Sequence, residues 1–209
     1  MFLYDQWYFR CKCQRCEDPT EFGTNTSGLP CPACCHLVLP ETAEAWRCRG
    51  CGRPESVAEV WRREERLREL AFTKPQPYNI TTSLKQLHAL SKLLHNNHYI
   101  IMELKQSFLF AFSMNLKKVR DLSLEQRAKL VPLWSAQEKY CRQLLAYHEV
   151  LDPGSSLIKT KLLFELRKIL LLQSKVLVGS EGEQSRDHLI KVLNEIKSLN
   201  TLVYTQVPL

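Results

Sequence analysis

Two pairs of cysteines in the first quarter of the sequence have the spacing of metal ligands. Cys31 and Cys34 form one C-x2-C pair, and Cys48 and Cys51 form a second pair after thirteen intervening residues. A two-residue gap lets the chain curl so that both sulfurs of a pair face one ion, and two such pairs supply the four thiolates of a tetrahedral zinc site. Gly52, directly after the second pair, is able to take the positive φ that such a turn often requires. We therefore predict a zinc ribbon, with reduced thiols that hold no metal as the alternative.

A second cluster, Cys11, Cys13 and Cys16, offers only three thiolates. Three closely spaced sulfurs fill three corners of a tetrahedron, so the fourth ligand of this site has to come from elsewhere. Cys35 and His36 are the nearest candidates, but their neighbours already serve the ribbon. Cys35 has three interpretations: a replacement for the preceding cysteine, a ligand of the second cluster, or an ordinary small buried residue, which base rates favour.

The distribution of cysteines indicates the compartment. Only Cys141, which we predict to be a buried thiol, lies beyond residue 51. Paired cysteines also occur in secreted disulfide frameworks, but the first residues show no basic stretch followed by an apolar core and a cleavage site. We therefore expect an intracellular protein, cytoplasmic or nuclear, in which clustered thiols bind metal rather than form disulfides.

The charge is distributed unevenly along the chain. The net charge is +7, yet residues 1–55 carry six Lys or Arg against seven Asp or Glu. A finger that binds phosphates needs its basic residues on the finger itself, and a site of four thiolates would make this module more acidic still. We therefore expect no direct nucleic-acid binding. No apolar run approaches the length that spans a bilayer, so no membrane segment is expected.

From Ser56 onward glycine becomes scarce and apolar residues recur at every third or fourth position, which predicts helices. Ser56-x-x-Glu59 is a capping box at the start of the first of them. In this helix, Glu59 and Arg63 and likewise Glu64 and Arg68 are four residues apart, which is the spacing of charge pairs along a helix. We interpret this charge run as a solvated face rather than as a binding patch.

The remaining sequence predicts further helices with short connections. Pro132 should break or kink a long element that begins at Ser123-x-x-Gln126. Asp152-Pro153-Gly154 predicts a turn. Later helices are expected at about residues 156–178 and 185–199. An apolar stripe marks the core face of the third helix and comprises Ile101, Leu104, Phe108 and Phe112. The histidines at 88, 95, 98 and 148 are interpreted as structural.

The predicted fold is a small Cys-rich zinc module, irregular or built on a β-ribbon, followed by an all-α antiparallel helical bundle. We place the boundaries at 1–20 for the three-cysteine segment, 21–55 for the four-cysteine ribbon and 56–209 for the helices. The helices show no strict 34-residue period, so a regular repeat array does not follow from the sequence alone.

One stretch resembles a known family. In WYFRCKCQRCED, aromatics precede a Cys-x-Cys-x2-Cys cluster, as in the post-SET segment of SET-domain lysine methyltransferases. The likeness continues from about Trp7 through DPTEFGT, VAEVWRREERL, LHNNHYIIMELKQ and VLDPG, and it resembles the C-terminal half of the SMYD (SET and MYND) family. The second cysteine pair is similar to the arthropod-type branch of that family. The resemblance implies a degenerate tetratricopeptide-like (TPR-like) bundle that closes over a substrate cleft.

In the SMYD family the fourth thiolate of the post-SET zinc comes from an N-H-x-C motif in the SET domain. The 209 residues contain no N-H-x-C, and the MYND module and the glycine-rich SET opening are likewise missing. The resemblance aligns Phe9 with the aromatic that packs on the adenine of S-adenosylmethionine, and Trp7 with a residue beside the lysine channel. The plainer interpretation is that residues 1–9 form a hydrophobic lead-in that packs on the zinc site.

Two functions follow as hypotheses. In the first, the chain is the C-terminal portion of a SMYD-like protein-lysine N-methyltransferase, with Zn²⁺ as its own cofactor and S-adenosylmethionine used only by a full-length form. No catalytic residue is then expected within the chain, and the chain alone is predicted to be inactive. In the second, it is a non-catalytic zinc-binding module. In either case the helical domain is expected to bind a protein substrate or a protein partner.

Overall fold

The computed structural model describes residues 11–42, 45–72, 80–120, 122–154, 156–178 and 183–206. These residues fall into two compact units. The first holds everything described up to residue 72 together with 85–103, and the second holds 80–84 and everything described from 104 onward. The described ranges contain no helix that is both long enough and apolar enough to cross a bilayer.

The first unit contains a small antiparallel sheet in the strand order β1-β2-β3-β4. Its register pairs Leu29 with Val38, Val38 with Cys48, and Trp46 with Glu55. Val38 is fully buried and lies in one apolar cluster with Cys31 and Cys48. The strands are β1 (Leu29–Pro30), β2 (Leu37–Pro40), β3 (Ala45–Cys48) and β4 (Pro54–Ser56), preceded by the short helix α2 (Gln14–Glu17).

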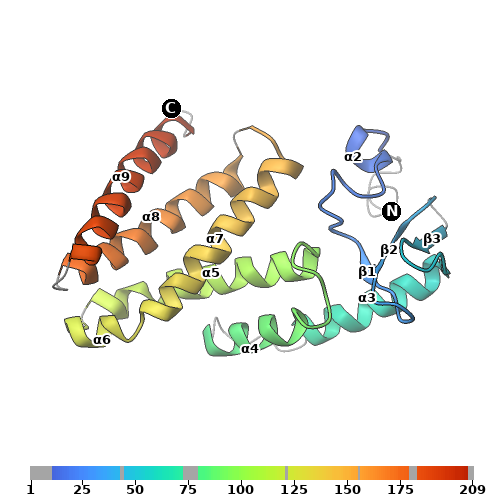
Figure 1. Ribbon diagram of the computed structural model, residues 1–209, viewed down its shortest axis with the longest axis horizontal. Coiled ribbons are helices and arrows are strands. Elements are labelled where there is room, and N and C mark those ends of the chain that lie inside the picture. Colours follow the sequence, from blue (N-terminus) through green and yellow to red (C-terminus); the bar gives the residue numbers. More distant parts are fainter. Residues whose placement is uncertain are drawn as a thin grey trace. The chain divides into compact units, whose positions relative to one another are not determined.

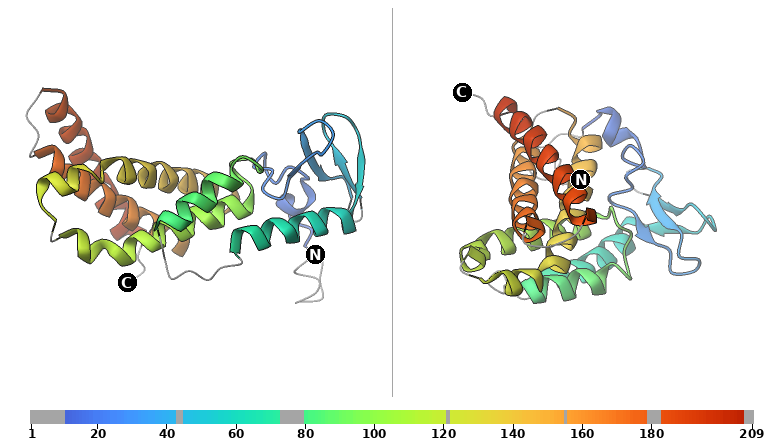
Figure 2. Two further views of the ribbon diagram at one scale, coloured as in Figure 1. Left: turned by 90° about the horizontal axis from the view of Figure 1, so that it is seen from below. Right: turned by 60° about the vertical axis from the view of Figure 1, so that its left-hand side comes forward.

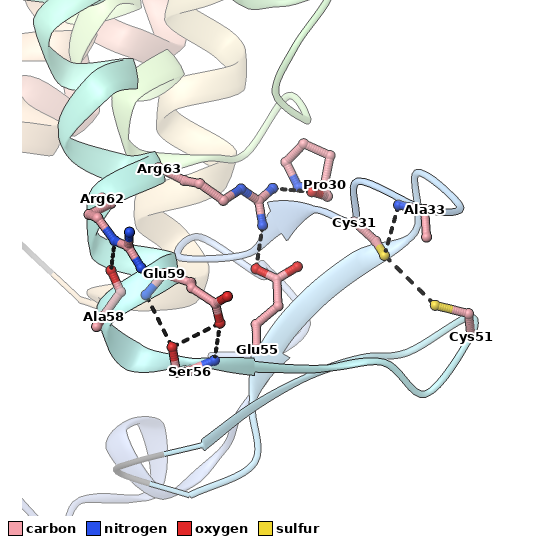
Figure 3. A network of polar contacts seen from close by, with 10 residues as sticks. All are labelled: Pro30, Cys31, Ala33, Cys51, Glu55, Ser56, Ala58, Glu59, Arg62 and Arg63. Carbon is pink, nitrogen blue, oxygen red and sulfur yellow. Dashed lines mark hydrogen bonds and ion pairs between the residues drawn. The ribbon is translucent and has the colours of Figure 1, made fainter.

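Helix α3 (Val57–Phe72) follows β4 directly and begins at the predicted capping box. The Ser56 amide and hydroxyl donate to the Glu59 carboxylate at 2.9 and 2.8 Å, and the Glu59 amide donates back to the Ser56 hydroxyl (Figure 3). Of the two predicted charge pairs, Glu59 and Arg63 form no ion pair with each other among the described residues, whereas Glu64 and Arg68 interact through their charges and both contact Tyr99. Arg63 pairs instead with Glu55 of β4, and Glu64 accepts a hydrogen bond from the Tyr99 hydroxyl. Arg63 therefore pairs with a residue of a neighbouring element rather than with the residue four positions earlier in its own helix.

The loop before β1 is joined to the turn that precedes α5 (Tyr99–Arg120). The Tyr99 amide donates to the Thr26 carbonyl at 2.9 Å, and the Thr26 hydroxyl donates to the Asn97 carbonyl. His98 is buried at this junction, where its Nδ1 accepts a hydrogen bond from the Ile100 amide. Helix α4 (Ile80–Leu90) lies just before this turn in the sequence.

The second unit is helical, as the sequence predicted. Helices α7, α8 and α9 run alternately up and down, with α8 between the other two (Figures 1 and 2). The interior of the second unit contains Phe108 of α5. The Phe108 and Tyr140 rings pack edge to face, with their centroids 5.7 Å apart. The helices are α6 (Leu124–Ala128), α7 (Val131–Leu151), α8 (Leu157–Val178) and α9 (Glu183–Gln206).

Local signals set the breaks between these helices. Ser123 and Gln126 form the predicted capping box of α6. Pro132 lies in the first turn of α7, where its missing amide hydrogen removes no helical hydrogen bond, so the predicted break falls just before it. Gly154, in the turn after α7, has a φ of 98°. Of the predicted apolar stripe, Ile101, Leu104 and Phe108 are buried, and the side chain of Phe112 lies outside the description.

Candidate metal centre

Two turns of the ribbon bring four cysteine sulfurs together. Cys31 and Cys34 belong to the turn between β1 and β2, and Cys48 and Cys51 to the turn between β3 and β4. The Sγ atoms of these four residues all lie within 4.8 Å of one another. Because β2 pairs with β3 in antiparallel direction, the turn before β2 and the turn after β3 lie at the same end of the sheet. The first cysteine of each turn is buried, with 2% of its surface exposed.

The spacing of the sulfurs fits a tetrahedral zinc ion. A zinc ion with Zn–S bonds of about 2.3 Å separates its four sulfurs by about 3.8 Å. The Cys31 and Cys51 sulfurs are 3.7 Å apart, and the Cys34 and Cys48 sulfurs are 3.4 Å apart. Four thiolates with no oxygen ligand form a soft donor set that selects zinc over magnesium or calcium. The group could therefore hold a zinc ion with little rearrangement.

Backbone amides prepare the sulfurs for negative charge. The Ala33 amide donates to the Cys31 sulfur at 3.4 Å, and the Gly50 amide donates to the Cys48 sulfur at 3.3 Å (Figure 3 shows the first of these). The backbone N–H groups of Cys51 and Gly50 lower the pKa of Cys48 to about 6. The neighbouring Cys48, Cys51 and Cys31 thiols raise the pKa of Cys34 to about 12. A thiolate is the form that binds metal, so Cys48 is prepared as a ligand, whereas Cys34 has to lose its proton when an ion binds.

The two turns have the same backbone design, which explains Cys35. The Cys35 amide donates to the Cys31 carbonyl at 2.9 Å, and the Gly52 amide donates to the Cys48 carbonyl at 3.1 Å. Both residues adopt a positive φ, 61° for Cys35 and 73° for Gly52. Cys35 therefore occupies the position of the turn glycine. Its thiol is exposed, so the expectation that it is an ordinary buried residue was wrong.

The second cluster lies in the segment around α2. The sulfurs of Cys11, Cys13 and Cys16 all lie within 4.8 Å of one another. The backbone N–H of Cys16 lowers the pKa of Cys13 to about 7. Within the described part of the chain, this group has three ligands, and neither Cys35 nor His36 joins it.

The other candidate residues are distributed as follows. Trp7 and Phe9 lie outside the described residues. Cys141 is fully buried and donates to the Leu162 carbonyl, and burial raises its pKa to about 12, which makes it an inert core thiol.

Sequence reasoning missed two features of the ribbon. One is the contact between Gly50 and His36, since a Cβ at residue 50 would lie 2.5 Å from the imidazole Cγ. The other is the buried carboxylate of Glu55, which ties β4 to Arg63 of α3. The glycine inside the second C-x2-C pair could have signalled the first feature, whereas the second depends on a contact between elements.

Comparison with known proteins gives one partial relationship. No family model matches the chain. A segment of 57 residues is 44% identical to part of the "SET domain-containing protein SmydA-8, isoform B" of Drosophila melanogaster. The match covers 24% of this chain and 13% of that protein's length. This similarity supports a relationship to SET-domain proteins of the SMYD type for that segment.

Proposed function

We propose that the chain is the zinc-binding, helical C-terminal portion of a SMYD-like, S-adenosylmethionine-dependent protein-lysine N-methyltransferase of the arthropod-type branch. The observation that carries the proposal is the 44% identity over 57 residues to a SET-domain-containing protein. The three-sulfur cluster adds support, because a partner segment with one more thiolate would complete it. In this proposal the SET core is not among these 209 residues, which contain no N-H-x-C motif.

Zinc has a structural role in this proposal. Cys31, Cys34, Cys48 and Cys51 would hold one ion and join the two turns of the ribbon. A site closed by four protein ligands has no open position for substrate, and its binding free energy stabilises the fold. The Cys11, Cys13 and Cys16 sulfurs would hold a second ion, with the SET core as the source of the fourth ligand.

The methyl-transfer chemistry would belong to the full-length form. Phe9 and Trp7 are proposed only as walls of the cofactor and lysine pockets. By analogy with base stacking, one aromatic surface contributes about 1 to 3 kcal/mol, whereas even millimolar binding requires about 4 kcal/mol. The chain alone is therefore expected not to bind S-adenosylmethionine. The helical unit, TPR-like in this proposal, would contact the protein substrate or a partner in the cytoplasm or nucleus.

Two measurements test this proposal. Titration calorimetry of the zinc-loaded chain with S-adenosylmethionine should show no saturable heat. Micromolar binding would contradict the proposal that the cofactor site needs the SET core. Transcript sequence upstream of Met1 should contain an in-frame SET core with N-H-x-C. Expressed with that core, the protein should bind the cofactor and gain a second tightly held zinc ion. A stop codon directly upstream of Met1 would refute the proposal.

A second candidate function is a non-catalytic protein-interaction module. Large apolar side chains of the helical unit are exposed, with 70% of Leu157, 71% of Val178 and 52% of Ile190 accessible. These side chains are available for contact with a partner, although Leu157 and Val178 lie at opposite ends of α8 and scattered apolar residues are also normal on protein surfaces. The upstream sequence distinguishes the two functions, because an isolated module needs no SET core.

A further inference from the structure

A basic cavity lies between the ribbon and the first turns of α3, and Pro32 of the first cysteine turn contributes to its lining. Its volume is about 220 Å³. Arg62, Arg63 and Arg66 line it from one face of α3, and Arg53 lines it from the segment before β4. Glu55 and Glu59 complete its charged lining, which leaves a net charge of +2. Figure 3 shows how Arg62 and Arg63 extend from the helix beside these two carboxylates.

Hydrogen bonds within the unit already engage both carboxylates. Glu59 accepts from the Ser56 amide and hydroxyl as the capping box of α3. Glu55 accepts from Arg63, whose other terminal nitrogen donates to the Pro30 carbonyl. These bonds hold Arg63 in place as part of the cavity wall.

The remaining three arginines form no ion pair in the described part of the chain. Arg53, Arg62 and Arg66 are exposed, and Arg62 uses only its Nε, which donates to the Ala58 carbonyl at 3.2 Å. Each guanidinium still offers a planar set of donors, which suits bidentate bonds to phosphate or carboxylate oxygens. At about 220 Å³ the cavity is smaller than the sites of drug-sized ligands, so it suits a single ionic group rather than a whole cofactor.

The buried carboxylate of Glu55 narrows the class of ligand. Only 7% of Glu55 is exposed, and its Oε1 has no hydrogen-bond partner among the described residues. A buried acceptor without a partner is unfavourable, so a ligand that brings a donor is favoured here. A peptide backbone supplies N–H donors beside its side chains; a nucleic acid also carries donors, on its ribose hydroxyls and its bases. The acidic balance of residues 1–55 is what disfavours nucleic acid.

In contrast to the solvated face that the sequence predicted for this charge run, we infer that this cavity binds a phosphorylated side chain in a peptide segment of a protein partner. The phosphate contacts Arg53, Arg62 and Arg66, and an adjacent N–H of the peptide donates to Glu55. Recognition of phosphate by a cluster of arginines is a general mode of peptide binding. The inference uses neither the cysteine sulfurs nor S-adenosylmethionine, so it stands or fails separately from the proposed methyltransferase relationship.

The test uses the full zinc-loaded chain with ¹⁵N-labelled arginine. The probe is a mixture of peptides with a central phosphoserine and three degenerate positions on each side, titrated while the arginine Nε–H resonances are followed by NMR. The unphosphorylated mixture, inorganic phosphate and a uridine decamer are titrated in parallel. Arg62→Gln and Arg66→Gln remove guanidiniums of the cavity. Arg49→Gln is the matched control, because Arg49 is an exposed arginine of the ribbon that does not line the cavity.

The phosphorylated mixture should bind saturably, at least about tenfold tighter than the unphosphorylated one. Arg62→Gln and Arg66→Gln should each weaken it by about tenfold, and Arg49→Gln should leave it unchanged. Three results would overturn the inference: equal binding of both peptide mixtures or no binding, inorganic phosphate that binds as tightly as the phosphopeptides, or a decamer that binds more tightly than they do. Zinc analysis of each variant shows whether the ribbon stays intact.

Discussion

Replacing His98 with asparagine should remove a pH-dependent loss of stability from the first unit. Burial, with a smaller contribution from the charge of His95, lowers the pKa of His98 to about 3. Its Nδ1 accepts from the Ile100 amide at 3.2 Å, so the ring carries its hydrogen on Nε2, which is buried and has no partner in the described residues. The folded state therefore holds a neutral imidazole that resists protonation.

The sign and size of the effect follow from linkage. Since the folded pKa lies below the unfolded value of 6.5, the unfolded chain binds the proton first as the pH falls. Stability is present in full above pH 6.5 and falls between there and the folded pKa. At about pH 5, which is roughly 1.5 pH units below the unfolded pKa, proton binding by the imidazole stabilises the unfolded state by about 2 kcal/mol. The unit should therefore be about 2 kcal/mol less stable at about pH 5 than at about pH 7.5.

Hydrogen–deuterium exchange measures this effect within the unit. The opening free energy of residues 99–103, corrected for intrinsic exchange, is compared at the two pH values. His98→Asn keeps an acceptor for the Ile100 amide at the start of α5 but does not titrate, so the variant should lose most of the pH-dependent difference, whatever cavity it creates. His188→Asn is the control: it changes an exposed histidine of α9, so this variant should keep the pH-dependent difference.

Zinc content is measured at both pH values, so that release of the ion by acid is seen directly. Equal pH dependence in wild type and His98→Asn would refute the assignment of a buried neutral imidazole. A loss of the pH dependence in His188→Asn would refute it as well.

Three further predictions concern the cysteine turns and the helical core. Cys48→Ser should lower the zinc content by about one ion per molecule, whereas Cys35→Ser should leave it unchanged; metal analysis of purified protein decides between them. Cys35→Gly should raise the free energy of unfolding by up to about 1 kcal/mol, because glycine adopts the positive φ at that turn without steric penalty; a destabilised variant would contradict this. Phe108→Ala should lower the stability of the helical unit by about 3 to 5 kcal/mol in urea unfolding followed by far-UV circular dichroism, while Phe110→Ala, an exposed position on the same helix, should change it little; overlapping curves for Phe108→Ala and wild type would refute the packing.

Local patterns in the sequence were sufficient for much of the fold. The two C-x2-C pairs predicted a ribbon, and the structure brings their four sulfurs within 4.8 Å of one another. The capping boxes at Ser56 and Ser123 begin helices as expected, and Pro132 marks the break before α7. Each of these features depends on hydrogen bonds or sterics between residues no more than a few positions apart, so residue type and spacing determine them.

Other features depend on which distant residues meet, and only the tertiary structure decided them. Arg63 has Glu59 at the right spacing along its helix, yet it pairs with Glu55, because β4 places a buried carboxylate against the helix. The sequence predicted a structural role for His98, but only the packing of the turn shows that the imidazole is removed from water. Burial and electrostatic partners are set by elements that approach from far along the chain, and a short sequence window contains no information about that approach.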